Sequence, residues 1–148
     1  MIDRLQEKDI DQVAQIEAEI FSVPWSIKSF KDALASEQNI YLKAETDGQI
    51  VGYCGIWTSF ESADLCNIAV KKEFRKAGLG QKLLEAGIQE AAAKGVERIL
   101  LEVRQSNKAA IRLYEKNGFQ TIGLRKSYYT KPAEDAILME RFIRKMAE

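Results

Sequence analysis

The sequence predicts an α/β domain in which a mixed sheet, containing one parallel strand pair, carries helices on both faces. Apolar residues recur first at helical and then at strand spacing, in the order ααβββαβαββ. A strand, a glycine turn, a helix and a second strand follow one another between residues 63 and 103. Such a crossover unit places its two strands parallel. Elements of this order build layers of helix and sheet around one core.

Size and composition favour one domain covering residues 1–148. Acidic and basic residues number 22 each, so no overall charge favours a nucleic-acid or membrane partner. The chain has no histidine, the commonest metal ligand, and we expect no metal site. Its charged start and the lack of a long apolar run argue against a signal peptide or membrane span. Cys54 and Cys66 lie in strand-like runs and are expected to be buried, reduced thiols of a cytoplasmic protein.

Two helices are expected first. One buried helical stripe is formed by Ile10, Val13, Ile16 and Ile20. Pro24 then breaks the pattern, and Ser26 suits the N-cap of a second helix that continues to Leu34. Trp25, between these helices, is either a packing anchor or a wall of a ligand site. Because large aromatic side chains mostly serve burial, the anchor is favoured by the residue type alone.

Three strands are expected next. Residues 41–45 and 49–57 flank Thr46-Asp47-Gly48, a turn signal typical of a hairpin. A third strand covers residues 63–70 and leads into a basic turn.

That turn carries Arg75, Gly78 and Gly80 between the strand and the start of a helix. Free N–H groups and the dipole at a helix start favour phosphate, and glycines permit close approach of the backbone. A P-loop is excluded because no Lys followed by Ser or Thr comes after the second glycine. The dinucleotide fingerprint is excluded because its third glycine would fall at Leu83. Arg75-x-x-Gly78-x-Gly80 therefore remains either a different phosphate-binding turn or an ordinary strand–turn–helix corner.

The rest of the chain supplies the last elements. The helix after the turn ends at Gly95, and a strand covers residues 98–103. Ser106-Asn107 caps another helix, which ends at Asn117-Gly118. Two final strands, over residues 119–125 and 136–142, are separated by Tyr128-Tyr129 and Pro132.

Several segments together resemble the GCN5-related N-acetyltransferase (GNAT) superfamily over nearly the whole chain. They are Asn67-Ile68-Ala69-Val70, residues 74–80, Ser106-Asn107, Leu113-Tyr114-Glu115 and Asn117-Gly118-Phe119. Three more narrow the resemblance to the bacterial enzymes that acetylate the N-terminal alanine of ribosomal protein S18 (the RimI type). These are Pro24-Trp25-Ser26, Leu101-Glu102-Val103-Arg104, and residues 125–129 with Glu134-Asp135-Ala136. Ser127 departs from those enzymes, which usually have Asn at that position.

The resemblance implies a mostly antiparallel sheet, acetyl-CoA as cosubstrate and the N-terminus of ribosomal protein S18 as protein substrate. It makes Glu102 the general base and Tyr114 the general acid. It assigns cofactor binding to Ile68, Ala69, Val70, Arg75, Lys76, Ala77, Gly78, Leu79, Gly80, Gln81 and Asn107. We predict that the peptide groove is walled by Pro24, Trp25, Tyr128 and Tyr129.

The chemistry agrees with these roles but leaves alternatives open. Acyl transfer to an amine needs a base for the amine, a polarised carbonyl and a proton for the departing thiolate. Strand alternation places Glu102 on the opposite face from Leu101 and Val103, where partly apolar surroundings would raise its pKa toward that of a useful base. Alternatively, Glu102 simply pairs with Arg104. Tyr114 lies on an inward helical stripe and is either a core residue or the acid.

Three other functions remain possible from the sequence. The same fold could acetylate a small-molecule amine or another protein. It could also bind CoA without catalysis, although the intact Glu102 and Tyr114 argue against this. A nucleic-acid-binding module is disfavoured because the basic residues cluster only at the glycine turn.

Overall fold

The computed structural model describes residues 1–75 and 77–143, so Lys76, a predicted cofactor contact, lies outside the described residues. The strands are β1 (Ile2–Arg4), β2 (Asn39–Thr46), β3 (Gln49–Ser59), β4 (Ser62–Val70), β5 (Arg98–Arg104), β6 (Gln120–Thr130) and β7 (Ala133–Phe142). The helices are α1 (Ile10–Ile20), α2 (Ile27–Ala35), α3 (Leu79–Ala93) and α4 (Lys108–Lys116), with short 3₁₀ turns at Glu7–Asp9 and Lys72–Phe74.

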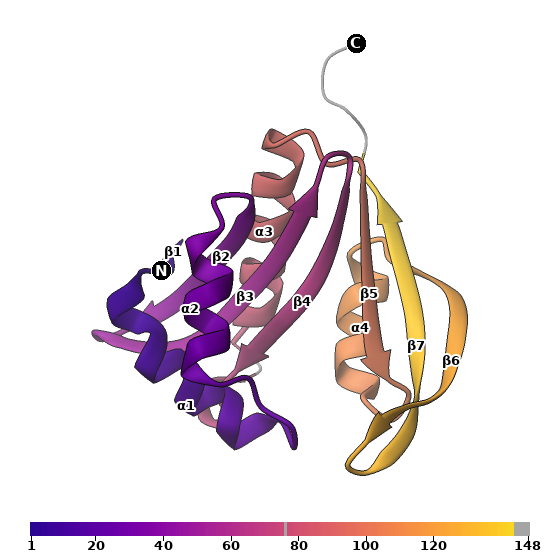
Figure 1. The fold of residues 1–148 in the computed structure, drawn as a ribbon, viewed down its shortest axis with the longest axis horizontal. Coiled ribbons are helices and arrows are strands. Elements are labelled where there is room, and N and C mark those ends of the chain that lie inside the picture. Colours follow the sequence, from indigo (N-terminus) through magenta and orange to yellow (C-terminus); the bar gives the residue numbers. More distant parts are fainter. Residues whose placement is uncertain (76, 144–148) are drawn as a thin grey trace.

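The strands form one sheet in the order β1-β2-β3-β4-β5-β7-β6. The β4–β5 pair is parallel and the other described neighbours are antiparallel. Helices α1 and α2 lie in front of the sheet in Figure 1, and α3 lies behind it. The mixed, mostly antiparallel sheet with a parallel pair and helices on both faces is therefore confirmed.

Each face of the sheet has its own apolar core. On the face of α1 and α2, Val13 and Ile16 pack with Phe30 and with Tyr53 of β3. On the opposite face, the apolar stripe of α3 packs with residues of β2–β5 and with Tyr114 of α4. Within the described ranges no helix is both long and apolar enough to cross a membrane.

Local sequence signals placed most elements correctly. Ser26 caps α2 as predicted, because its Oγ accepts a hydrogen bond from the Ser29 N–H at 3.1 Å. Gly95 and Gly118 follow the ends of α3 and α4 with positive φ, as expected. Strand β1 was not predicted, since three residues carry too little pattern to recognise.

The last hairpin differs from its prediction. Strand β6 continues to Thr130, so Tyr128 and Tyr129 belong to the strand and not to a separating loop. Its pairing with β7 jumps between Arg125 and Tyr129, and Ser127 within this irregularity has a positive φ of 53°. Since an irregular stretch interrupts the two-residue alternation on which strand recognition depends, the sequence pattern ended the strand too early.

Candidate active site

The parallel strands β4 and β5 stay together for only a short distance. Their pairing covers Ser62–Asp64 of β4 and residues 98–100 of β5. Beyond Asp64 the two strands diverge, as Figure 1 shows, and each continues with a single neighbour, β3 or β7. Two strand edges therefore face one another across an opening inside the sheet.

A β-bulge lies just after the point of divergence. Leu65 pairs with Ile56 and Asn67 pairs with Gly55, so Cys66 is an extra residue without a partner on β3. The bulge reverses which side chains face which core: Leu65 belongs to the core of α3, whereas Asn67 accepts a hydrogen bond from Tyr41 in the core of α1 and α2. The prediction of two buried thiols is thus right for Cys54 and wrong for Cys66, which is exposed at the bulge.

One hydrogen bond shows which residues of β4 direct their backbone N–H and C=O groups toward β3. The Lys71 N–H donates to the Val51 carbonyl at 2.7 Å, across the register that pairs Val70 with Gly52. Bonded and non-bonded pairs alternate along an antiparallel ladder. Ala69 therefore bonds to β3, while Ile68 and Val70 direct their N–H and C=O groups into the opening.

The predicted phosphate turn follows β4. Gly78 has a φ of +79°, a backbone conformation that favours glycine. A Cβ added there would meet nothing within 4 Å, so this conformation, and not a lack of space, is the reason for glycine at this position. Helix α3 begins at Leu79. Its first backbone hydrogen bond runs from the Lys82 N–H to the Gly78 carbonyl at 3.1 Å. The N–H groups of Leu79, Gly80 and Gln81 consequently have no acceptor within the helix and lie at the positive end of its dipole.

Three of the predicted cofactor contacts have side chains with partners inside the protein. Arg75 donates from Nε to the Val70 carbonyl at 2.9 Å, which places its guanidinium beside the end of β4. The Gln81 amide exchanges two hydrogen bonds of 2.8 Å with the Asn117 amide, which ties the start of α3 to the end of α4. The Asn107 Oδ1 caps α4 by accepting from the Ala110 N–H at 3.2 Å.

Glu102 lies on β5 beside the opening. Its neighbours Leu101 and Val103 are buried in the core of α3, so Glu102 projects from the opposite face, as predicted. It is exposed and ion-paired to Arg125 Nε at 3.6 Å, and it does not have the partly apolar surroundings that we expected. Burial and the Glu102 carboxylate, which accepts its hydrogen bond, raise the pKa of Tyr128. The alternative pairing of Glu102 with Arg104 is wrong, because Arg104 pairs with Glu134 at 3.3 Å.

Tyr114 belongs to the other face of the sheet. It projects from α4 into the core and packs edge-on against Phe119, with ring centroids 5.8 Å apart. Its hydroxyl has no hydrogen-bond partner among the described residues, where every fully buried side-chain N or O atom is paired. The hydroxyl is therefore not completely enclosed by the described residues. Burial raises the pKa of Tyr114 well above the ordinary tyrosine value, so this group stays protonated at neutral pH.

The predicted substrate walls come from two separate segments. Trp25 is half-buried in the loop between α1 and α2, and its ring packs against that of Trp57 with the centroids 5.7 Å apart. It also lines a hollow of about 630 Å³ that extends to Asp64. Pro24 beside it is exposed. Tyr128 and Tyr129 form an edge-to-face pair 5.1 Å apart on β6. Trp25 is thus both a packing anchor and the lining of a hollow, so the two interpretations do not exclude each other.

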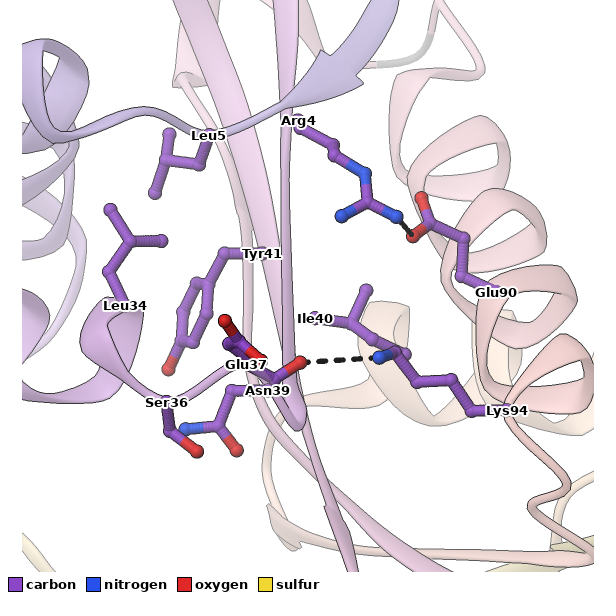
Figure 2. Close-up of a pocket in the computed structure, with 10 residues that line it drawn as sticks. All are labelled: Arg4, Leu5, Leu34, Ser36, Glu37, Asn39, Ile40, Tyr41, Glu90 and Lys94. Carbon is purple, nitrogen blue, oxygen red and sulfur yellow. Dashed lines mark hydrogen bonds and ion pairs between the residues drawn. The ribbon is translucent and has the colours of Figure 1, made fainter.

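A second hollow, of about 390 Å³, lies at the far edge of the sheet between β2, α2 and α3. Figure 2 shows three of its charged side chains with partners: Arg4 pairs with Glu90 at 3.1 Å, and the Lys94 Nζ donates to the Glu37 backbone carbonyl at 3.2 Å. None of the predicted site residues lines it. The opening between β4 and β5 is therefore the better candidate for chemistry.

Comparison with known proteins identifies the family. The family model described as "Acetyltransferase (GNAT) family" matches residues 10–119. The chain belongs to this family. A Bacillus subtilis relative, designated a candidate ribosomal protein bS18-alanine N-acetyltransferase, is 44% identical over 89% of this chain and 88% of its own. The ribosomal protein bS18-alanine N-acetyltransferase of Haemophilus influenzae is 35% identical over 97% of this chain and 99% of its own. The crystal structure of the ribosomal-protein-S18-alanine N-acetyltransferase from Escherichia coli superimposes with a TM-score of 0.90 at 36% identity, covering 100% of this chain and 96% of that one.

As a GNAT acetyltransferase, the chain uses acetyl-CoA as its acetyl donor. The residues fit that molecule. Among the described residues, the N–H and C=O of Ile68 and the N–H of Val70 are free backbone groups of the kind that an added strand, or the amides of a pantetheine arm, can bond. The free N–H groups of Leu79, Gly80 and Gln81 suit a pyrophosphate. Within residues 1–75 and 77–143, no cluster of acidic or thiol side chains could hold a metal ion.

Two residues that matter to the site were not assigned a role from the sequence. Glu17 of α1 is buried and accepts a hydrogen bond from the Trp25 N–H at 3.0 Å and another from the Tyr53 hydroxyl. Arg125 is the partner of Glu102. Glu17 could have been recognised from the sequence, because it is a charged residue within the apolar stripe of a predicted helix. No comparable signal exists for Arg125, because its partner is distant in the sequence.

We expect Gly78→Val to weaken CoA binding at least tenfold. A β-branched residue resists a φ of +79°, so the turn must rearrange and its N–H groups no longer converge on one anion. Gly48→Val is the matched control, because Gly48 has a φ of +76° in the β2–β3 hairpin and equally open surroundings. Calorimetric titration with CoA measures both variants. Equal affinity for CoA in the two variants would contradict the phosphate assignment.

Proposed function

We propose that this protein transfers the acetyl group of acetyl-CoA to the N-terminal α-amine of ribosomal protein S18, at an N-terminal alanine. The reaction would take place in the cytoplasm, where ribosomal proteins are made. The names of the relatives reported above support the substrate, and the site described above supports the chemistry.

One observation carries the proposal. Glu102 and Tyr114 belong to opposite faces of the sheet, and the opening between β4 and β5 lies between those faces. An acyl group held in the opening can be approached by an amine from the Glu102 side and by an acid from the Tyr114 side. A base and an acid on opposite sides of the reacting carbon are what acyl transfer between two different atoms requires.

The proton movements follow from this arrangement. Glu102 accepts the proton of the attacking amine, either directly or through one water, as the new C–N bond forms. The backbone N–H of Ile68 or Val70, which faces the opening, can polarise the carbonyl oxygen. Tyr114 gives its proton to the sulfur as the C–S bond breaks, and its raised pKa keeps that proton available at neutral pH.

The exposure of Glu102 bears on the choice of amine. An α-amine has a pKa near 7.7–8.0, whereas that of a lysine side chain is near 10.4. Deprotonating the lysine at neutral pH therefore costs about 3 kcal/mol more. A single exposed, ion-paired carboxylate is a modest base, so it suits an N-terminal amine better than a lysine.

Incubation with acetyl-CoA and a peptide of the S18 N-terminus tests the substrate. We expect mass spectrometry to find the acetyl group on the α-amine of the alanine. The same peptide with a blocked N-terminus, together with a panel of small amines including polyamines, serves as control. Preferential acetylation of a lysine or of a small amine would contradict the proposal.

The assigned roles predict that Glu102→Gln and Tyr114→Phe each lower kcat by about 10²-fold, because each removes a proton-transfer group and little else. CoA affinity, measured by calorimetry, should stay near that of the unmodified protein. Glu140→Gln is the matched control, since Glu140 is a carboxylate on the neighbouring β7 that pairs with Arg98. If both Glu102→Gln and Tyr114→Phe keep the kcat of the wild-type protein, the assigned roles are wrong.

A further inference from the structure

Arg104 joins three segments that are distant in the sequence. It is the last residue of β5 and lies two residues after Glu102, hence on the same face of the strand. Only 24% of its side chain is exposed. The catalytic roles proposed above do not use it.

Most of its contacts hold the end of the β6–β7 hairpin. The Arg104 Nη1 donates to the Pro132 carbonyl at 2.9 Å and to Glu134 Oε1 at 3.3 Å. Nη2 donates to the Lys131 carbonyl at 3.3 Å. The guanidinium also stacks on the Tyr129 ring, 4.3 Å from its centroid. One predicted wall of the peptide groove is therefore fixed to Arg104.

The same guanidinium also contacts the loop that carries the other predicted wall. Nη2 lies 3.5 Å from the Ser22 Oγ, in the loop between α1 and α2 that carries Trp25. This loop is held at its inner side by Glu17, which accepts from the Trp25 N–H. Arg104 therefore contacts both this loop and the hairpin.

We infer that Arg104 is a positioning residue that sets the spacing of the two walls of the peptide groove, and thereby the affinity for a peptide substrate. This inference rests on the proposed function. Arginine suits the task because its planar guanidinium carries five donors in a fixed geometry and can stack on a ring at the same time. A lysine ammonium cannot meet carbonyl, carboxylate and hydroxyl oxygens on two sides. The Glu134 carboxylate is itself held by the Ser106 N–H, so the partner of Arg104 is also fixed in place.

The test compares a long S18 N-terminal peptide with alanine amide, a small amine that cannot span both walls. For Arg104→Ala we expect the KM of the long peptide to rise about tenfold or more, while kcat falls less than about twofold. The KM of alanine amide should change by less than about twofold. Arg104→Lys should resemble Arg104→Ala, since charge without the planar fork does not restore the contacts.

Arg98→Ala is the matched control, because Arg98 begins the same strand and pairs with Glu140 on β7, away from both walls. It should leave the peptide KM unchanged. The melting temperature shows whether Arg104→Ala folds. If it does not fold, Glu134→Gln is used instead, because it removes only one carboxylate acceptor, and it should raise the peptide KM about threefold.

Different outcomes separate the two levels of the proposal. If the wild-type protein acetylates neither the peptide nor alanine amide, the proposed function is wrong, and this inference fails with it. An active protein whose Arg104→Ala variant keeps the original peptide KM, or loses activity equally on both amines, overturns this inference alone. Full recovery of the peptide KM in Arg104→Lys would also overturn it.

Discussion

The whole site depends on the early separation of β4 from β5. Backbone N–H and C=O groups inside a sheet ordinarily bond to both neighbours, and leaving them unpaired is costly once water is excluded. Here two central strands share only the short pairing that ends at Asp64 and Leu100. Along this edge the N–H and C=O of Ile68 and the N–H of Val70 have no partner among the described residues, whereas the Val70 carbonyl accepts from Arg75 Nε. The edge lies in the middle of the sheet, where a ligand can bond to it as a strand would.

The proposed base and acid lie on the two faces of the sheet. The Cys66 bulge reverses the alternation of β4 at the point where the strands part, while β5 alternates regularly and so places Glu102 on the face of α1 and α2. Tyr114 approaches from the other face because α4 packs against the α3 core. The Glu102 carboxylate and the Tyr114 side chain thus belong to opposite faces of the sheet, as the proposed roles of base and acid require.

The sequence predicted those features that depend on neighbouring residues. The turn at Gly78, the cap at Ser26 and the face of Glu102 follow from local spacing and were confirmed. Features that depend on distant partners were not predictable: Glu102 pairs with Arg125 and not with Arg104, because β5 meets the β6–β7 hairpin only in the folded sheet. The exposure of Cys66 was missed for a related reason, since a bulge is defined by the partner strand and leaves little trace in one strand's own pattern.

The central claim is that acetyl-CoA completes the open edge of β4. Amide hydrogen exchange followed by NMR, with and without CoA, tests it residue by residue. We expect CoA to slow exchange at the amides of Ile68 and Val70 and to leave Ala69, already bonded to β3, nearly unchanged. Unaltered exchange at Ile68 and Val70 under saturating CoA, or equal slowing at all three amides, would contradict it.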